Sequence, residues 1–297
     1  MTGSAAVTAA DARRAALVRA MPGLFVLIWS TGFIVARYGM PHAPPLKFLA
    51  VRYALSMACF LVWVRWARVA WPDGRRQWGH LAVVGVLMQA GYLGGVWAAV
   101  RAGMGSGLVA LLVGIQPVLT AVWLSMFGGR ITPRQWTGLL LGFGGLVLVV
   151  SRKLGQGGEV TPLTMALALT ALFSITAGTL YQKRFLAPCD VRSASAIQMA
   201  AALLVTLPFA ALEPDRIHWN LASGGAMAWS VLALSLGGSS LLYMLIQRGT
   251  ATAVTSLLYL VPPCTAVMAW LLFAEPITAL TVAGIAVTAV GVSLVVR

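Results

Sequence analysis

The chain has 297 residues, of which 60% are apolar and only 9% are charged, and its mean hydropathy is +0.88. Because soluble domains carry about a quarter charged residues, this composition excludes an ordinary soluble protein. A net charge of +14 would favour a nucleic-acid partner in a soluble chain. Here the basic residues stand between apolar runs, where they orient a protein in a lipid bilayer, and we expect no nucleic-acid partner.

Apolar runs long enough to cross a bilayer follow one another along the chain. A helix needs about 20 apolar residues to span the hydrocarbon core. Residues 1–20 are interpreted as a cytoplasmic tail. Polar, proline-rich and glycine-rich breaks then separate ten candidate spans: 21–38, 46–66, 79–100, 105–127, 133–151, 160–182, 193–212, 224–247, 250–273 and 276–296. The sequence therefore predicts an all-α polytopic membrane protein with ten transmembrane helices.

Lysine and arginine are unevenly distributed between the two sets of span ends. If the N-terminus is cytoplasmic, the inner ends carry about twice as many of these residues as the outer ends. Positive residues are enriched on the cytoplasmic side of membrane proteins. Both the N-terminus and the C-terminus are therefore predicted to be cytoplasmic.

A long internal repeat divides the chain into two halves. The segment Phe127-Gly-Gly-Arg-Ile-Thr132 returns as Phe273-Ala-Glu-Pro-Ile-Thr278, an offset of 146 residues, and the same offset pairs Pro117 with Pro263. A self-similarity at nearly half the chain length indicates a duplicated unit, an architecture that is typical of membrane transporters.

Each predicted repeat, 21–151 and 160–296, contains five spans. Because five is odd, the second copy enters the membrane from the opposite side, and a pseudo-twofold axis in the membrane plane relates the copies. Inverted repeats place a substrate site near the midplane and expose it to alternate sides. Pro117 and Pro262-Pro263 fall within spans at matching places and predict helix breaks close to that site.

The candidate site residues are polar or aromatic side chains within the spans. Arg52 lies about two turns into the second span, and either a role in a cavity or a link to a neighbouring helix explains it. Aromatic rings with amide and hydroxyl groups suit an uncharged or zwitterionic solute, although single Trp and Tyr residues also serve packing and interface belts. With Arg52, the predicted substrate-binding residues are Trp29, Thr31, Gln89, Tyr92, Trp97, Gln116, Thr176, Tyr181, Gln198, Ser239, Tyr243 and Tyr259.

Carboxylates are expected only in tails, loops and span ends. A proton-coupled exporter of cations normally binds proton and substrate alternately at a buried acid, so transport is predicted not to be strictly proton-coupled. If transport were strictly proton-coupled, Glu159 and Glu275 would be the first candidates for the proton-binding residue. Cys59, Cys189 and Cys264 lack metal-ligand spacing. We expect no metal, no cofactor and no catalytic residues, so the chain is predicted not to be an enzyme.

The segment from Arg101 to Pro117, followed by 127–132 and 138–145, resembles the signature of the EamA family of the drug/metabolite transporter superfamily. Residues 247–291 resemble it equally. The resemblance implies two inverted five-helix repeats, a bacterial inner membrane and export of metabolites such as amino acids. In its aromatic-rich spans the chain is similar to YddG-type exporters of aromatic amino acids. One departure is that a glutamate common in the family appears only as Glu275, opposite Gly129.

These expectations support export of amino acids, aromatic or otherwise bulky and apolar, by alternating access. Export of drugs or other small amphipathic metabolites is the alternative within transport. A membrane sensor that keeps the fold is an alternative of another class. The expected partners are a small-molecule substrate and the lipid bilayer, and the expected assembly is a monomer or weak homodimer.

Overall fold

The computed structural model describes residues 2–104, 109, 112–126, 130–150, 160–249, 251–273 and 279–296, which form helices and turns without strands. Segments η1 and η3 are π-helical and η4 is a 3₁₀ helix. The elements in chain order are α1 (Thr2–Gly39), α2 (Pro45–Trp66), α3 (Arg75–Gly85), η1 (Val86–Gly91), α4 (Tyr92–Arg101), α6 (Gln116–Met126), α7 (Pro133–Val150), α8 (Pro162–Phe185), α9 (Val191–Leu212), α10 (Leu221–Trp229), η3 (Ser230–Ser239), α11 (Ser240–Arg248), α12 (Ala251–Ser256), η4 (Leu257–Leu260), α13 (Val261–Phe273) and α14 (Ala279–Val296).

Seven stretches of the described chain are long and apolar enough to cross a membrane: Arg19–Ala36, Pro45–Trp66, Arg75–Arg101, Pro162–Phe185, Val191–Leu212, Leu221–Arg248 and Val254–Leu272. The prediction of an all-α polytopic protein is confirmed in this form, whereas the count of ten spans stays a prediction. The repeated turns at 127–129 and 274–278, including Glu275, and the segment 151–159, including Glu159, lie outside the described residues.

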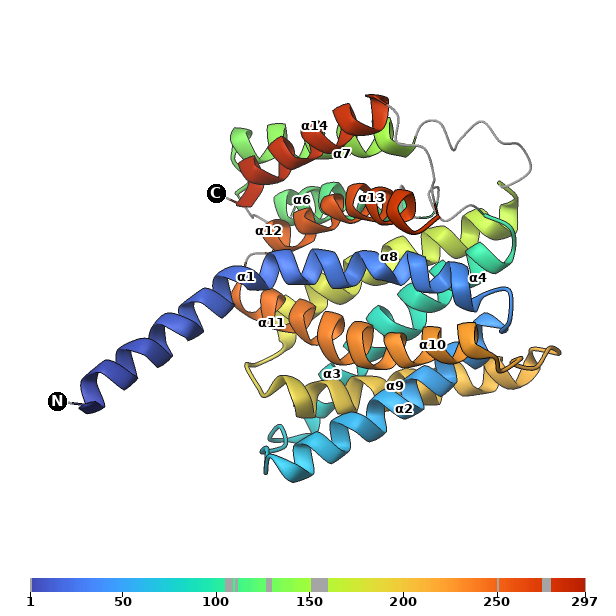
Figure 1. Ribbon diagram of the computed structural model, residues 1–297, viewed down its shortest axis with the longest axis horizontal. Coiled ribbons are helices and arrows are strands. Elements are labelled where there is room, and N and C mark those ends of the chain that lie inside the picture. Colours follow the sequence, from blue (N-terminus) through green and yellow to red (C-terminus); the bar gives the residue numbers. More distant parts are fainter. Residues whose placement is uncertain are drawn as a thin grey trace.

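The helices form a layered bundle, and two helix pairs lie on opposite sides of it (Figure 1). One pair is α2 with α9, and the other is α7 with α14. The bounds of α2 and α9, Pro45–Trp66 and Val191–Leu212, differ by the repeat offset of 146 residues at both ends. The same offset relates Pro133–Val150 to Ala279–Val296. Each of these helices thus packs against its own counterpart in the sequence repeat.

Glycine makes the contact between α7 and α14 close. A Cβ atom added at Gly291 would lie 2.6 Å from the carbonyl oxygen of Gly138 and would also collide with the backbone nitrogen of Gly142. Neither backbone can move without displacing its helix. Small residues at such crossings allow two helix backbones to approach in a membrane.

Replacing Gly291 with valine is therefore expected to destabilise the protein by about 1 to 3 kcal/mol or more, because two helix axes must separate. Thermal unfolding in detergent measures the change. Gly144→Ala is the matched control on α7, since a Cβ atom there would meet nothing within 4 Å. Equal melting temperatures for Gly291→Val and the wild type would contradict the close contact.

Two predicted spans are interrupted near their middles by π-helical turns. Segment η1 joins α3 to α4, and η3 joins α10 to α11. Segments of this kind occur frequently at functional sites, because the extra residue per turn re-aims the side chains that follow. Helix boundaries also fall beside the prolines that predict helix breaks. In the first repeat α6 begins at Gln116, directly before Pro117. In the second repeat the 3₁₀ helix η4 ends at Leu260 and α13 begins at Val261, directly before Pro262-Pro263.

Candidate substrate-binding site

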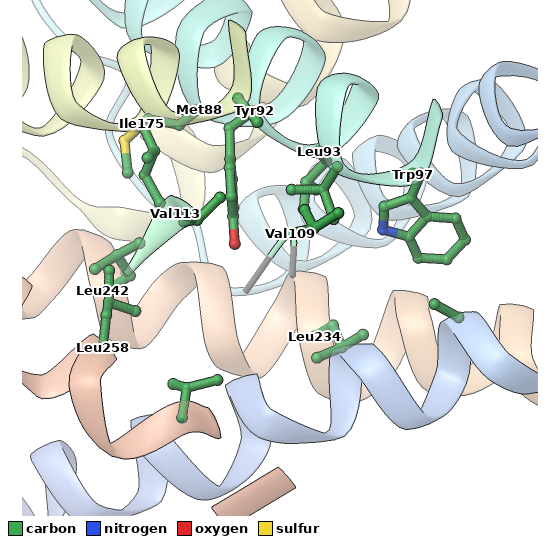
Figure 2. Close-up of a cluster of buried hydrophobic side chains, with 14 of the residues drawn as sticks. Met88, Tyr92, Leu93, Trp97, Val109, Val113, Ile175, Leu234, Leu242 and Leu258 are labelled. Atoms are coloured by element: carbon green, nitrogen blue, oxygen red, sulfur yellow. The ribbon is translucent and has the colours of Figure 1, made fainter. Parts of the chain in front are cut away.

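A central cavity of about 40 Å³ lies between α1, α2, α4 and η3, and we call it the arginine chamber. It has room for about three water molecules, which is too little for a solute as large as an amino acid. Figure 2 shows Tyr92, Leu93 and Trp97 projecting from one helix toward Leu234 and Leu242 on the facing helix. The lining residues are Trp29, Gly32, Ala36, Arg52, Tyr92, Leu93, Val96, Trp97, Val100 and Leu234.

Arg52 gives this otherwise apolar chamber its positive charge. The side chain is 3% exposed and is the only buried charged group in the described part of the chain. Its Nε donates a hydrogen bond of 3.0 Å to the hydroxyl of Ser235 on η3. No described carboxylate forms an ion pair with it. A membrane-buried cation without a counter-ion is energetically expensive, and a bound anion would compensate that cost.

A second and smaller cavity of about 10 Å³ has polar walls, and we call it the glutamine chamber. Its size is that of one water molecule. Gln89 Nε2 lies 3.4 Å from the hydroxyl oxygen of Ser239, and Gln182 Nε2 donates to the carbonyl oxygen of Tyr243 at 3.2 Å. The lining residues are Trp29, Met88, Gln89, Gln182, Gln198, Ser239, Leu242 and Tyr243.

Trp29 lines both chambers. Its ring is stacked on that of Tyr92, with centroids 6.2 Å apart and planes 2° from parallel. On its own helix it contacts Phe25, with centroids 5.2 Å apart. The indole ring of Trp29 is therefore part of the wall of both chambers.

At one end of the bundle, α2 and α9 hold each other by their termini, in a cluster that we call the Glu213 clasp (Leu46, Lys47, Glu213 and Asp215). The carboxylate of Glu213, the residue that follows α9, accepts hydrogen bonds from the backbone N–H groups of Leu46 at 3.0 Å and Lys47 at 2.8 Å. In return, Lys47 Nζ donates to the carbonyl oxygens of Glu213 and Asp215, both at 2.6 Å. An anion at a helix N-terminus and a cation at a C-terminus are both favourable.

Polar contacts also join the helices at the opposite end of the bundle. Lys183 Nζ donates to the carbonyl oxygens of Ile246 at 3.1 Å and Gln247 at 3.3 Å, which ties α8 to the end of α11. The hydroxyl of Tyr243 lies 3.0 Å from the sulfur of Cys189. The chambers are thus bounded by interhelical hydrogen bonds at both ends.

The structure brings eight of the predicted site residues to the two chambers: Trp29, Arg52, Gln89, Tyr92, Trp97, Gln198, Ser239 and Tyr243. Thr31 lies elsewhere, because its hydroxyl accepts a hydrogen bond of 2.8 Å from Trp229 at a separate apolar groove. Tyr181 also lies elsewhere, with its hydroxyl 2.7 Å from His80 Nδ1.

Three further predicted residues are buried in helix contacts outside the chambers. Gln116 Nε2 donates to the hydroxyl of Thr179 at 3.2 Å. The hydroxyl of Thr176 donates to a backbone carbonyl of its own helix at 2.7 Å. The ring of Tyr259 packs against Gly142, where an added Cβ atom would collide with it. In this structure these side chains therefore serve packing.

Two residues of the chambers are absent from the sequence prediction. Ser235 accepts the hydrogen bond of Arg52, and Gln182 lines the glutamine chamber. A signal was available for Ser235, because the repeat offset of 146 residues pairs it with Gln89, a predicted site residue. Gln182 had no such signal, since its counterpart is Ala36. Its position on α8 beside Tyr243 follows only from the packing.

The family of the chain follows from its match to known sequences. Residues 23–151 and 162–297 each match the EamA-like transporter family. The chain belongs to this family. The match occurs once in each predicted repeat, and membership in a transporter family agrees with the expectation that this EamA protein is not an enzyme.

Several transporters are similar to this EamA protein over most of its length. An "Uncharacterized transporter" of Archaeoglobus fulgidus is 25% identical over 91% of this chain and 94% of its own length. The "Uncharacterized inner membrane transporter YedA" of Escherichia coli is 26% identical over 82% of this chain and 78% of its own. A "Probable amino-acid metabolite efflux pump" of Salmonella typhimurium is 25% identical over 63% and 60%, respectively.

A solved crystal structure shares the fold of this EamA protein. It superposes with a TM-score of 0.76 over 93% of this chain and 95% of its own, at 18% sequence identity. At that identity the similarity concerns the fold alone.

Proposed function

We propose that this EamA protein exports amino acids across a bacterial inner membrane by alternating access. The observation that carries the proposal is the buried guanidinium of Arg52, which faces the arginine chamber without a carboxylate partner among the described residues. A substrate carboxylate would supply the missing negative charge and form charge-assisted hydrogen bonds. The efflux pump of Salmonella typhimurium and the inner-membrane protein of Escherichia coli support this substrate class and location.

The chamber walls favour aromatic or bulky apolar amino acids. Tyr92, Leu93, Val96 and Trp97 form an apolar face beside Arg52. Such a face would hold a large apolar side chain while the guanidinium binds the α-carboxylate. Cationic drugs fit this chamber poorly because Arg52 would repel them, so the alternative substrates are other carboxylate-bearing metabolites.

The two inverted repeats give the proposal its mechanism. With both termini cytoplasmic, the Glu213 clasp lies at the outer side and Lys183 at the cytoplasmic side. Opening the contacts around Lys183 would admit the substrate from the cytoplasm, and opening the clasp would release it outside. Trp29 would move in each cycle, because it lines both chambers.

The test is counterflow in proteoliposomes that contain the purified full-length protein. Vesicles loaded with unlabelled phenylalanine should accumulate labelled phenylalanine, and a panel of amino acids and carboxylate metabolites should compete according to the bulk of their side chains. Absence of counterflow with every amino acid in the panel would refute the proposal.

The same assay tests coupling. Counterflow is expected to persist at equal pH on both sides with a protonophore present, because no described carboxylate is buried and a proton would have no acid to occupy in the chambers. The result is compared with counterflow under an imposed pH gradient. Strict dependence on the gradient would contradict the prediction and direct attention to Glu159 and Glu275.

A further inference from the structure

The glutamine chamber is the counterpart of the arginine chamber in the sequence repeat. The offset of 146 residues pairs Arg52 with Gln198 and Trp97 with Tyr243, and it relates four further lining residues of one chamber to four of the other. Six of the eight residues that line the glutamine chamber are related in this way. The two cavities thus occupy equivalent places in the two halves of the chain.

The two residues that form the hydrogen bond of Arg52 have counterparts in the repeat as well. Arg52 on α2 donates to Ser235 on η3, and the offset converts this pair into Gln198 on α9 and Gln89 on η1. Both Gln198 and Gln89 line the glutamine chamber. The positions match, but the chemistry differs, since a permanent cation in one chamber is replaced by a neutral amide in the other.

Two polar atoms of this pair lack partners. Gln89 is 4% exposed and Gln198 is 5% exposed. Gln89 Oε1 and Gln198 Nε2 are buried without a hydrogen-bond partner among the described residues. Leaving a buried donor or acceptor unpaired is unfavourable. Together the two amides present one acceptor and one donor to the same cavity, which is the complement of an ammonium group and a carboxylate.

We propose that the glutamine chamber is a second substrate subsite, in which Gln89 accepts a hydrogen bond from the ammonium group and Gln198 donates one to the carboxylate of a zwitterionic amino acid. The inference rests on the proposed function. The amino acid occupies this subsite when the protein opens at the Lys183 end, and it occupies the arginine chamber when the protein opens at the Glu213 clasp. Because Gln198 is neutral and offers one bond, whereas Arg52 is a cation whose planar guanidinium binds a carboxylate with two parallel bonds, the carboxylate is held more weakly by Gln198 than by Arg52.

The experiment measures the KM for labelled phenylalanine separately at each membrane face, in right-side-out and inverted membrane vesicles that contain the full chain. Gln89→Leu and Gln198→Leu should each raise KM about 10-fold at the cytoplasmic face, the effect of one lost hydrogen bond, and leave the outer face unchanged. Arg52→Gln should instead raise KM at the outer face and leave the cytoplasmic face unchanged. Gln135→Leu is the matched control, because among the described residues the side chain of Gln135 accepts hydrogen bonds only from Thr132, just before α7, and it lines neither chamber.

Analogues that lack one charged group test the two roles. Phenylalaninamide, without the carboxylate, and 3-phenylpropionate, without the ammonium group, should both compete less well than phenylalanine at the cytoplasmic face. Gln198→Arg should restore strong competition by 3-phenylpropionate there. If a leucine variant does not fold, Gln89→Met and Gln198→Met replace it, because methionine keeps the length and removes the hydrogen bonds.

Three outcomes would overturn the inference. Lower melting temperatures with an unchanged KM at both faces would mean that the cavity holds only a water molecule. An equal rise of KM at both faces would mean a single common site. Wild-type transport that responds to Arg52→Gln but not to the glutamine variants would contradict this inference alone, whereas no transport by the wild type would refute the proposed function as well.

Discussion

Arg52→Gln is expected to raise the KM for amino acids by about 10- to 150-fold at the outer face, because a hydrogen bond to a charged group contributes about 1.5 to 3 kcal/mol. Glutamine keeps a donor for Ser235 and removes the charge that binds the carboxylate. The melting temperature should stay the same or rise, since the variant removes a buried cation without a described counter-ion. Transport kinetics and thermal unfolding of the same preparations measure both effects.

The conservative variant separates charge from geometry. Arg52→Lys keeps the positive charge but loses the planar guanidinium that binds a carboxylate with two parallel bonds, so its KM should lie between those of the wild type and Arg52→Gln. Arg134→Gln is the control for loss of one positive charge, because Arg134 is exposed on α7. A melting temperature that falls together with activity in Arg52→Gln would assign Arg52 to helix linkage instead.

The sequence predicted much of the fold because lipid imposes simple rules on it. Apolar length alone located the seven described stretches that are long and apolar enough to cross a bilayer. The internal repeat also relates helices that contact each other. The bounds of α2 and α9 differ by 146 residues, as do those of α7 and α14, and the helices of each pair pack together. Hydrophobic pattern could not predict η1 and η3. Apart from Gln89, the residues of these two segments are apolar or small, so a shift to π-helical geometry does not change the hydrophobic pattern.

The site was predictable only as far as helix faces could be assigned. Trp29 and Thr31 are two residues apart, which is about 200° around a helix. If Trp29 faces a cavity, Thr31 must therefore face away from it. Thr31 accordingly bonds to Trp229 on the other face of α1. The polar ring of Tyr259 predicts a substrate contact, but in the structure the ring packs against Gly142. This contact depends on close packing of distant segments and leaves no local signal in the sequence.

Glu213→Ala is expected to open the outer side of the protein. The carboxylate of Glu213 satisfies two N–H groups in the first turn of α2, where Pro44 supplies no side-chain cap. Loss of even one charge-assisted bond of about 1.5 kcal/mol would shift the ratio of closed to open forms at least about 10-fold. Glu213→Gln should have a smaller effect, since the amide retains one acceptor oxygen.

Thiol labelling distinguishes opening of the clasp from general loosening. Single cysteines are placed at Val96 in the arginine chamber and at Leu242, its counterpart in the glutamine chamber, after Cys59, Cys189 and Cys264 have been replaced by alanine. Glu213→Ala should accelerate labelling at position 96 about 10-fold and slow it at 242, because a form that is open outside is closed inside. Faster labelling at both positions would instead indicate partial unfolding. Unchanged labelling at both would mean that the clasp caps two helices without controlling access. Only the opposite response of the two positions fits a clasp that holds the outer side of an alternating-access transporter closed.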